Sequence, residues 1–183
     1  MKIYTRKGDD GSTSLWYGGR LSKSDARTDA YGSLDEAVSA LGVARSHATD
    51  ERLHADILRL QKELFVAGAE LATAPEARGR LEAGISMITD EMVARLEQDV
   101  DWYMSQVELP PKFVIPGGTA VSAQLDLART ILRRAERRIV FVNEQGDGVA
   151  ASLLSYVNRA SDLLFAMARF ADEPEPELFE GRG

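Results

Sequence analysis

The sequence predicts an all-α fold, a five-helix antiparallel bundle preceded by a polar N-terminal loop. Apolar residues recur at helical spacing in five segments that cover most of the chain from about residue 25 onward. Most connections between these segments are short, which favours antiparallel neighbours. No segment shows the apolar–polar alternation of a strand. The 183 residues, of which 44% are hydrophobic, fit one domain over 1–183 with a substantial core.

The first 22 residues differ from the rest and are predicted to form a loop. TRKGDDGSTSLWYGGRLS is rich in Gly, Asp, Ser and Thr and has no sustained helical or strand period. Its glycines, hydroxyls and cations are residue types that fold around a phosphate. These residues are Gly8, Gly11, Thr13, Ser14, Arg6, Lys7 and, just beyond the loop, Lys23. The Walker A pattern is absent, and a flexible N-terminus without a ligand is the alternative.

The five predicted helices differ in length and in what separates them. They cover about 25–48, 50–73, 90–109, 119–143 and 149–171. Prolines and glycines mark a loop between the second and third helices. PPKFVIPGGT, before the fourth helix, predicts a rigid extended connection. The tail over 172–183 is acidic and rich in proline, and we expect it to be disordered.

The fourth predicted helix carries the densest charge in the chain. RTILRRAERR contains five arginines and one glutamate, whereas the whole chain has a net charge of −7. On a helical wheel Arg129, Arg133 and Arg137 form a stripe beside the apolar face, while Arg134 and Arg138 point elsewhere. Guanidinium forks pair with phosphate oxygens, so the stripe could hold a polyphosphate. The alternative is a solvated face paired with acidic neighbours.

Three other features are candidates for a structural or a functional role. Asn158, Asp162 and Arg169 share one face of the last helix, which is either an exposed polar surface or a place where a nucleotide binds. Asp35 in the first helix is expected to pair with an arginine of the fourth. Phe113, in the rigid connection, either anchors that connection to the core or contacts a flat cofactor.

Composition excludes several classes of function. The absence of cysteine excludes disulfides, cysteine nucleophiles and thiolate metal sites. Two histidines argue against a histidine metal cage, and an excess of 29 acidic over 22 basic residues argues against general nucleic-acid binding. No apolar run reaches membrane-spanning length and MKIYTRKGDD lacks the apolar core of a signal peptide, so we expect a soluble cytoplasmic protein.

Five sequence blocks, taken in order, resemble the PduO-type ATP:cob(I)alamin adenosyltransferases. They are TRKGDDGSTSL, DARTDAYGSLDEAVSALG, FVIPGG, RRAERR and YVNRASDLLFAMARF. The resemblance covers all but the acidic tail and the segment 75–86. It implies a five-helix bundle that assembles as a homotrimer, with active sites between subunits. It also implies transfer of the 5′-deoxyadenosyl group of ATP to the cobalt of cob(I)alamin, with release of triphosphate and a need for Mg2+.

The resemblance also implies roles for individual residues. The N-terminal ATP-binding segment is expected to comprise Thr5, Arg6, Lys7, Gly8, Thr13, Ser14 and Lys23. The ATP site of the fourth helix is expected to comprise Arg133, Arg134, Glu136 and Arg137, joined by Asn158 and supported by Asp162. Mg2+ is expected to bind through the ATP phosphates and not through side chains. Lys7 stands where the family often has a small residue, and Trp16-Tyr17 make the loop bulkier, which could change ATP affinity.

Two further roles concern the cobalamin and the assembly. Phe113 resembles the aromatic residue that displaces the lower ligand of cobalamin, and together with Arg133 it is the expected catalytic group. Arg129 resembles the partner of Asp35 in an ion pair between subunits, while Arg138 keeps an ordinary surface role. A reductase and an adenosylcobalamin-dependent enzyme are the expected protein partners. The alternatives are a non-catalytic bundle that binds nucleotide or cobalamin for regulation or delivery, and an interaction scaffold.

Overall fold

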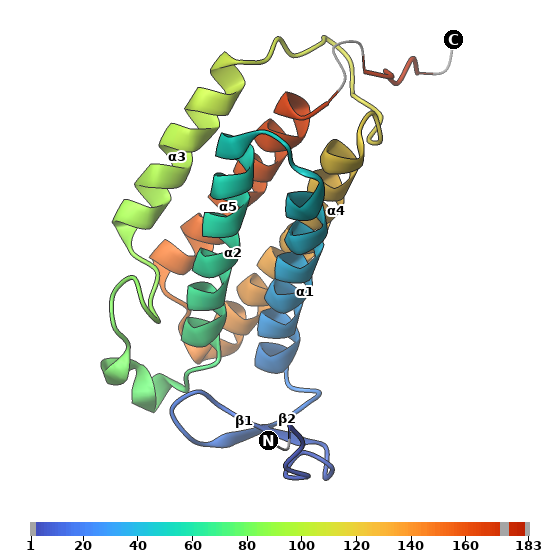
Figure 1. The fold of residues 1–183 in the computed structure, drawn as a ribbon. Helices are drawn as coiled ribbons and strands as arrows, with labels where there is room; N and C mark the ends of the chain where they lie inside the picture. The colour runs from blue at the N-terminus through green and yellow to red at the C-terminus, as the bar shows by residue number, and fades with distance from the viewer. Residues whose placement is uncertain (1–2, 173–175, 182–183) are drawn as a thin grey trace.

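The computed structural model describes residues 3–172 and 176–181. Its elements, in chain order, are β1 (Ser12–Ser14), β2 (Arg20–Ser22), α1 (Ala26–His47), α2 (Glu51–Leu71), the 3-10 helix η1 (Pro75–Arg80), α3 (Asp90–Ser105), α4 (Ala120–Val142), the π-helical turn η2 (Asn143–Asp147) and α5 (Ala151–Phe170). Successive long helices run in opposite directions, and α3 lies outside the other four, against α5 (Figure 1). The predicted helical bundle is therefore confirmed.

Side-chain caps explain why four of the five long helices begin where they do. Asp25, Asp50, Thr89 and Thr119 each accept a hydrogen bond from a backbone N–H in the first turn of the helix that follows. At α4 the cap is reciprocal, because the Ser122 hydroxyl also accepts from the Thr119 N–H at 3.0 Å. The start of α5 has no side-chain cap, so its position depends on packing.

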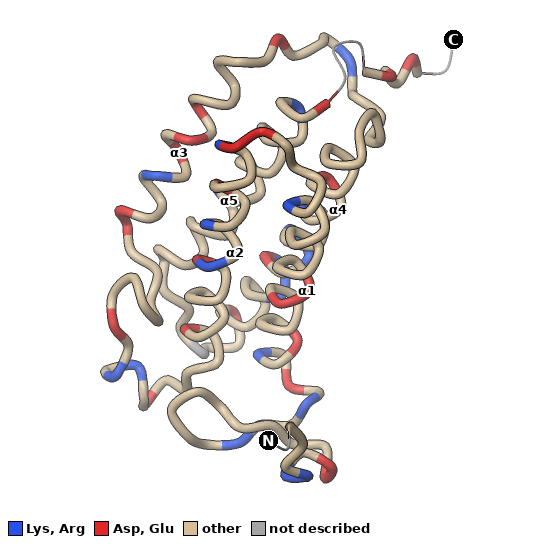
Figure 2. The backbone as a smooth tube through the Cα atoms, in the orientation of Figure 1, with Lys and Arg blue, Asp and Glu red and all other residues tan. Residues whose placement is uncertain are grey.

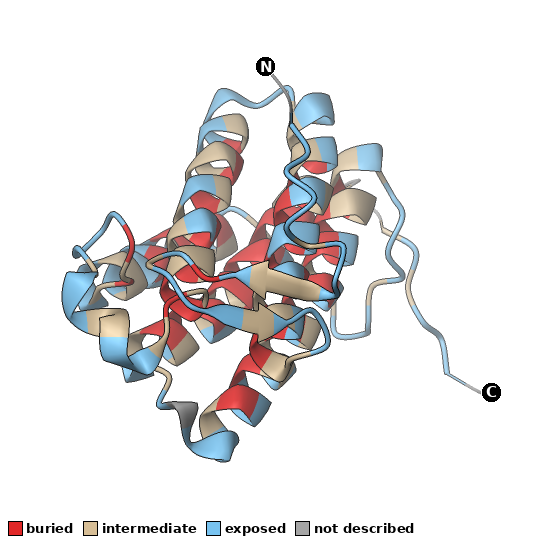
Figure 3. Cartoon of the chain, turned by 90° about the horizontal axis from the view of Figure 1, so that it is seen from below, coloured by how far each residue is buried: buried red, intermediate tan, exposed pale blue. Residues whose placement is uncertain are grey.

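The apolar faces of α1, α2, α4 and α5 meet in one core, which Figure 3 shows as the buried interior of the bundle. Alanines at the contact positions let the helix axes approach closely, as with Ala128 and Ala135 of α4 and Ala160 of α5, all fully buried. Leucines fill the space between them. Among the described helices, none combines the length and the apolarity that crossing a bilayer requires.

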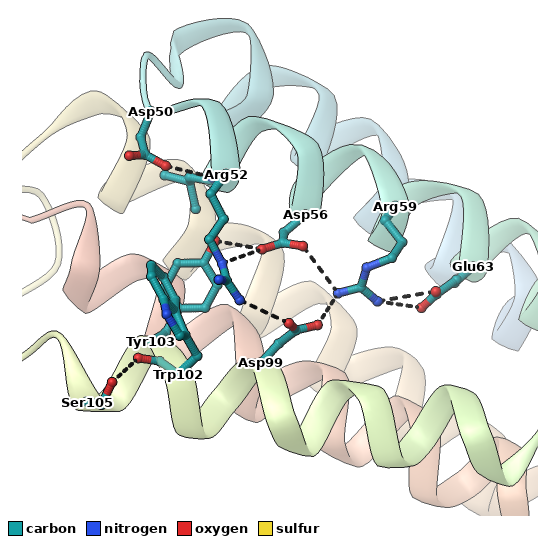
Figure 4. Close-up of polar contacts among 10 residues, drawn as sticks. Asp50, Arg52, Asp56, Arg59, Glu63, Asp99, Trp102, Tyr103 and Ser105 are labelled. Atoms are coloured by element: carbon teal, nitrogen blue, oxygen red, sulfur yellow. Dashed lines mark hydrogen bonds and ion pairs between the residues drawn. The ribbon is translucent and has the colours of Figure 1, made fainter.

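Two arginines of α2 connect that helix to α3 through a partly buried polar network, which the sequence analysis missed (Figure 4). Arg59 donates to both carboxylate oxygens of Glu63, at 3.1 and 3.2 Å, and to Asp99 of α3 at 2.5 Å. Arg52 lies 3.4 Å from the other oxygen of Asp99, and its guanidinium stacks 3.5 Å above the Trp102 ring. Loss of solvation on burial raises the pKa of Asp99 above its usual value.

Two buried tyrosines extend this network to α3 and α5. The Tyr103 hydroxyl donates to Asp56 at 3.0 Å, and the Tyr156 hydroxyl donates to Glu63 at 2.7 Å. Burial raises the pKa of both phenols well above the usual value, so they remain protonated donors. The network therefore joins α2 to α3 and, through Tyr156, to α5.

The expectation that the first 22 residues form a loop without strands is wrong in part. β1 and β2 pair antiparallel, with Thr13 opposite Leu21, and the hairpin lies across one end of the bundle (Figures 1 and 3). Gly18 and Gly19 adopt φ values of 100° and 83° in the connecting turn, a conformation that glycine adopts without strain. The Trp16 N–H donates to the Ala72 carbonyl at 2.9 Å, which attaches the hairpin to the end of α2.

The expected disorder of the tail is also wrong for the part that the structure describes. Val114 and Leu178 form an antiparallel bridge. The Ile115 N–H donates to the Glu177 carbonyl at 2.8 Å. Residues 176–181 thus run beside the connection that precedes α4, whereas 173–175 and 182–183 lie outside the described residues. Sequence composition could not reveal this pairing, because its partner lies more than sixty positions away in the chain.

Candidate functional site

Four arginines in the second half of α4, Arg133, Arg134, Arg137 and Arg138, face two different hollows. The Lys23 hollow, of about 490 Å³, lies between the start of α1 and the end of α4. It is lined by Lys23, Ser24, Ala26, Asp29, Arg134, Arg137, Arg138 and Phe141. The hollow has four cationic side chains and one carboxylate, a balance that suits a polyphosphate.

Carboxylates of α1 already bind two of these arginines. Arg134 forms an ion pair with Glu36, and Arg138 forms one with Asp29, with its Nε 2.7 Å from a carboxylate oxygen. Within the chain, the α1 partners of the α4 arginines are therefore Glu36 and Asp29, whereas Asp35, next to Glu36 in the sequence, is exposed and lines a groove between α1 and α2. Arg138 makes the ordinary acidic contact that was predicted for it.

The Arg133 hollow, of about 280 Å³, lies on the outer side of the same helix. It is lined by Arg133, Glu136, Arg137 and Val140. Asn158 of α5 reaches this side, because its Nδ2 donates to Glu136 at 2.8 Å. Arg137 borders both hollows, and its Nη1 donates to the Arg133 carbonyl at 3.1 Å. The structure thus brings Arg133, Glu136 and Asn158 together, whereas Arg134 borders the Lys23 hollow.

The N-terminal segment is folded upon itself by two cations. The Lys23 ammonium donates to the Gly8 carbonyl at 2.8 Å, and a Cβ at Gly8 would lie 3.2 Å from that nitrogen. Arg20, which the sequence analysis did not select, donates to the Lys7 carbonyl and the Ser12 hydroxyl. The Ser12 hydroxyl donates to Asp10 at 2.7 Å and lowers the pKa of that carboxyl. Arg20 therefore holds the loop that carries Lys7 and Gly8.

The other predicted ATP-binding residues of this segment are open to solvent. Thr5, Arg6, Lys7 and Ser14 are exposed, and Thr13 is half-buried. Arg6 adopts a φ of 60°, a conformation that a side chain makes unfavourable. Figure 2 shows basic positions both in this segment and along the helices above it. Among the described residues, no hydrogen bond or ion pair joins the segment 5–14 to Arg133, Glu136 or Asn158 of the same chain.

Phe113 lies at the opposite end of α4, and its side chain is 83% exposed. The interpretation in which it anchors its connection to the core is therefore wrong. The Phe113 hollow, of about 280 Å³, is lined by Leu109, Pro110, Lys112, Phe113, Val114, Pro116, Asp126, Arg129, Phe165 and Arg169. The Phe113 carbonyl accepts from the Phe179 N–H at 2.8 Å, so the tail fixes the backbone of Phe113 while its ring stays exposed.

Four charged residues line the Phe113 hollow: Lys112, Asp126, Arg129 and Arg169. Arg169 is buried and forms an ion pair with Asp126, so the interpretation of Arg169 as part of an exposed polar face is wrong. Arg129 Nε donates to Asp126 at 3.1 Å. Asp162 is half-buried and accepts from Arg159 at 2.7 Å. Sequence reasoning missed Asp126, whose only signal is its i,i+3 spacing from Arg129.

The chain is similar over nearly its whole length to corrinoid adenosyltransferases. The sequence model of the cobalamin adenosyltransferase family matches residues 3–171. The corrinoid adenosyltransferase of Citrobacter freundii is 41% identical, over 97% of this chain and 98% of its own length. The corrinoid adenosyltransferase PduO of Salmonella typhimurium is also 41% identical over 94% of this chain, which spans half of that longer protein.

The fold is similar to that of a solved structure with both substrates bound. A variant of the PduO-type ATP:corrinoid adenosyltransferase from Lactobacillus reuteri, complexed with cobalamin and ATP, superposes with a TM-score of 0.89 at 34% identity. The superposition covers 98% of this chain and all of that one. A second variant of the same enzyme, complexed with ATP, gives a TM-score of 0.86 at 33% identity.

Proposed function

This chain belongs to the cobalamin adenosyltransferase family, and from that premise we propose the reaction and the roles of its residues. It is an ATP:corrinoid adenosyltransferase, which transfers the 5′-deoxyadenosyl group of ATP to the cobalt of cob(I)alamin. The observation that carries the assignment is the arrangement along α4, with arginine-lined hollows at one end and the exposed Phe113 at the other. The non-catalytic alternative is not favoured, because the relatives that match over full length are transferases by name.

The reaction makes few demands for reactive side chains. Cob(I)alamin is itself the nucleophile: its cobalt forms the bond to C5′ of ATP, and the C5′–O bond breaks with its electron pair leaving on the triphosphate. The protein must align these atoms and stabilise the charge that develops on the leaving group. We assign this role to Arg133 and Arg137, which line the Arg133 hollow, and contact with the nucleoside to Asn158 and Glu136, which are hydrogen-bonded to each other beside it.

We assign Mg2+ to the triphosphate. Among the described residues, no three His, Asp or Glu side chains gather in a way that could hold a metal ion, whereas the cationic hollows suit phosphate oxygens. Bound there, Mg2+ supplies neutralisation of the charge on the leaving group. The side chains of Lys23, Arg133 and Arg137 would share that task.

A site between two copies of the chain would unite the two halves of the ATP-binding set. Among the residues that the structure describes, no hydrogen bond or ion pair joins the segment 5–14 to Arg133 or Asn158 of its own chain, so the segment of a neighbouring copy is the proposed partner. Asp35 lies at the rim of an apolar groove of about 720 Å³ between α1 and α2, where Phe65 and Ile85 are exposed. An apolar surface of this kind favours contact with another protein surface. These observations support the homotrimer, with Arg129 of one copy paired to Asp35 of the next.

Phe113 is the proposed apolar wedge at the cobalt. Its exposed ring, fixed by the backbone pairing of its connection with the tail, can occupy the space of the lower ligand of cobalamin. Removing that ligand leaves a four-coordinate cobalt(II), which is easier to reduce to the nucleophilic cobalt(I). Phe165 and Arg169 form the wall behind the ring.

The remaining assignments concern organisation and partners. We assign one domain over 1–183, with 1–22 as the ATP-binding segment, and a cytoplasmic location. Lys7 and Trp16-Tyr17 are the positions at which ATP affinity is expected to differ from that of relatives. A reductase that supplies the electron and an adenosylcobalamin-dependent enzyme that accepts the product are the proposed protein partners.

The proposed function is tested by comparing the turnover rate of the wild-type protein with the rates of one site variant and one control variant. Wild-type protein should form adenosylcobalamin from ATP and chemically reduced cobalamin, measured by absorbance. Arg133→Ala should lower kcat by about 10²–10³-fold, the usual loss when one preorganised donor to a developing anion is removed. Arg45, near the end of α1, donates to Gln61 of α2 at 2.9 Å and is not among the residues that line the Lys23 or the Arg133 hollow. Arg45→Ala is therefore the control and should keep the wild-type rate.

Each other outcome decides between the alternatives. An unchanged rate for Arg133→Ala would contradict the phosphate-binding role of that residue. Binding of ATP by the wild-type protein without turnover would favour the regulatory or delivery bundle. No binding of ATP would favour the scaffold.

A further inference from the structure

Asp126 binds two arginines at once, one with each of its carboxylate oxygens. Oδ2 accepts from Nη2 of Arg169 in α5, and Oδ1 accepts from Nε of Arg129, one turn further along α4, at 3.1 Å. The side chains of Asp126 and Arg169 are 6% and 4% exposed, whereas that of Arg129 is 27% exposed. Asp126 therefore connects a buried cation to one that reaches the surface.

The buried pair fixes the position of the Asp126 carboxylate. Arg169 also pairs with Asp172 at 3.5 Å, but its contact with Asp126 is the closer one. Breaking a buried ion pair is costly, so Asp126 is held against Arg169. An i,i+3 ion pair on an exposed helix surface is worth only about 0.2–0.5 kcal/mol and is readily broken. The contact between Asp126 and Arg129 differs, because one partner is already held in place from α5.

The contact with Asp126 leaves the end of the Arg129 guanidinium available. An arginine has five N–H donors in a planar fork, and Asp126 engages the one on Nε. Among the described residues, none accepts from the two terminal nitrogens of Arg129. With Nε held, the plane of the fork is set, and its end can form a bidentate pair with a carboxylate from outside the chain.

The same residues border the Phe113 hollow. Asp126, Arg129 and Arg169 line it together with Phe113 and Phe165, and the Arg169 guanidinium lies 5.6 Å from the centre of the Phe165 ring. A contact that Arg129 makes with another copy of the chain therefore occurs at the wall of the hollow in which Phe113 is proposed to work.

We propose that Asp126 is a positioning residue, which orients Arg129 so that its terminal nitrogens bind Asp35 of the partner subunit. The proposal rests on the inter-subunit ion pair assigned above and adds the residue that makes that pair possible. Asp126 thereby links the α4–α5 contact within one subunit to the contact between subunits.

The experiment measures how much the substitution Asp35→Asn weakens assembly of the subunits in different variants of the protein. Asp35→Asn is measured in the wild-type background and in the background Asp126→Asn/Arg169→Met, which removes both members of the buried pair. Asp172, which also pairs with Arg169 at 3.5 Å, keeps its hydrogen bond from the Ser122 hydroxyl at 3.1 Å in that background. Sedimentation velocity over a dilution series gives the dissociation constant of the assembly. Loss of Asp35 should weaken wild-type assembly about 10-fold, equivalent to about 1.4 kcal/mol. In the double variant the same loss should be below about 2-fold, because Arg129 is no longer oriented.

Two further backgrounds separate positioning from general damage. Glu70→Gln changes another buried carboxylate away from Arg129, and there the Asp35→Asn effect should remain about 10-fold. Arg129→Lys keeps the positive charge but has no Nε to bind Asp126, so there the effect should again fall below about 2-fold. This last variant changes a surface residue and decides the question even if the Asp126 variants do not fold, as judged by circular dichroism.

Equal effects of Asp35→Asn in all backgrounds, including no effect in any, would overturn the proposal. The measurement uses the protein without substrates, so it is independent of turnover. Equal effects in an enzyme with full activity would overturn only the role of Asp126. Unequal effects in a protein without activity would overturn only the adenosyltransferase assignment.

Discussion

Replacing Arg59 by methionine should strongly destabilise the protein, because this guanidinium lies among three carboxylates. Asp56, Glu63 and Asp99 are 3.6, 3.1 and 2.5 Å from its nitrogens. All four side chains are only 12–14% exposed, so water screens the uncompensated charges poorly. Breaking such a buried pair by removing one partner costs about 3–5 kcal/mol. For a domain of this size the melting temperature should fall by about 6–20 °C.

Thermal unfolding followed by circular dichroism measures this effect, and Arg159→Met is the matched control. Arg159 pairs with Glu97 at 3.3 Å and Asp162 at 2.7 Å, but its side chain is 37% exposed and its partners about half exposed. An exposed pair is worth at most about 1 kcal/mol. The control should therefore lose about 4 °C or less in melting temperature. Equal losses in the two variants would refute the claim that burial makes the Arg59 network different.

Through Tyr156 the network extends to α5, close in sequence to Asn158 but outside the hollows. The Tyr156 hydroxyl donates to Glu63, and Asn158, which contacts Glu136 in the Arg133 hollow, follows two residues later. Arg59 itself touches none of the residues in the hollows. Below its unfolding transition, Arg59→Met should therefore keep a KM for ATP close to wild type.

Three other predictions test separate parts of the structure. Phe113→Ala should change the free energy of unfolding by less than about 0.5 kcal/mol, because the ring is exposed, and should keep ATP binding by calorimetry; it should lose most activity with cob(II)alamin and a reductase, and full activity would contradict the wedge. Burial raises the pKa of Glu70, so the native state binds its proton more tightly and wild-type stability falls as pH rises from about 4.5 through the folded pKa. Glu70→Gln, which can still accept from the Ile88 N–H, should remove that fall in urea titrations between pH 4 and 8, and parallel curves would contradict it. Deleting residues 176–183 should speed hydrogen exchange of the Ile115 amide, which loses its acceptor at Glu177, and unchanged exchange would contradict the role of the tail.

The helices were predictable because their signals are local. The segment predicted over 25–48 forms a helix from Ala26 to His47, since apolar spacing fixes its buried face and Asp25 caps its start. The hairpin gave no such signal, because strands of three residues are too short to show alternation. Its one local sign is the pair Gly18-Gly19, which is typical of a hairpin turn.

Within the site, the sequence predicted which residues share one face of a helix. It could not predict which of those residues are buried by a neighbouring helix. Periodicity placed Arg169 with the polar residues of α5. It could not show that Asp126 lies beside it from α4 and allows its burial. The predicted disorder of the tail was wrong for the same reason, namely that a distant segment decides its structure. Its composition resembles that of a disordered segment, but its backbone pairs with residues near Phe113.

For Arg134 the helical wheel and the family resemblance led to different expectations, and the structure is compatible with both. The helical wheel separated it from Arg133, whereas the resemblance placed both in one ATP site. In the structure Arg134 pairs with Glu36 of α1 and borders the Lys23 hollow, and Arg133 borders the other hollow. Arg133 and Arg134 therefore face different hollows on α4. If each ATP lies between two chains, the two arginines need not bind the same phosphate group. Arg134→Ala should then weaken ATP binding less than Arg133→Ala, because Glu36 already compensates part of the charge of Arg134. Equal losses for the two variants would place both guanidiniums on the same triphosphate.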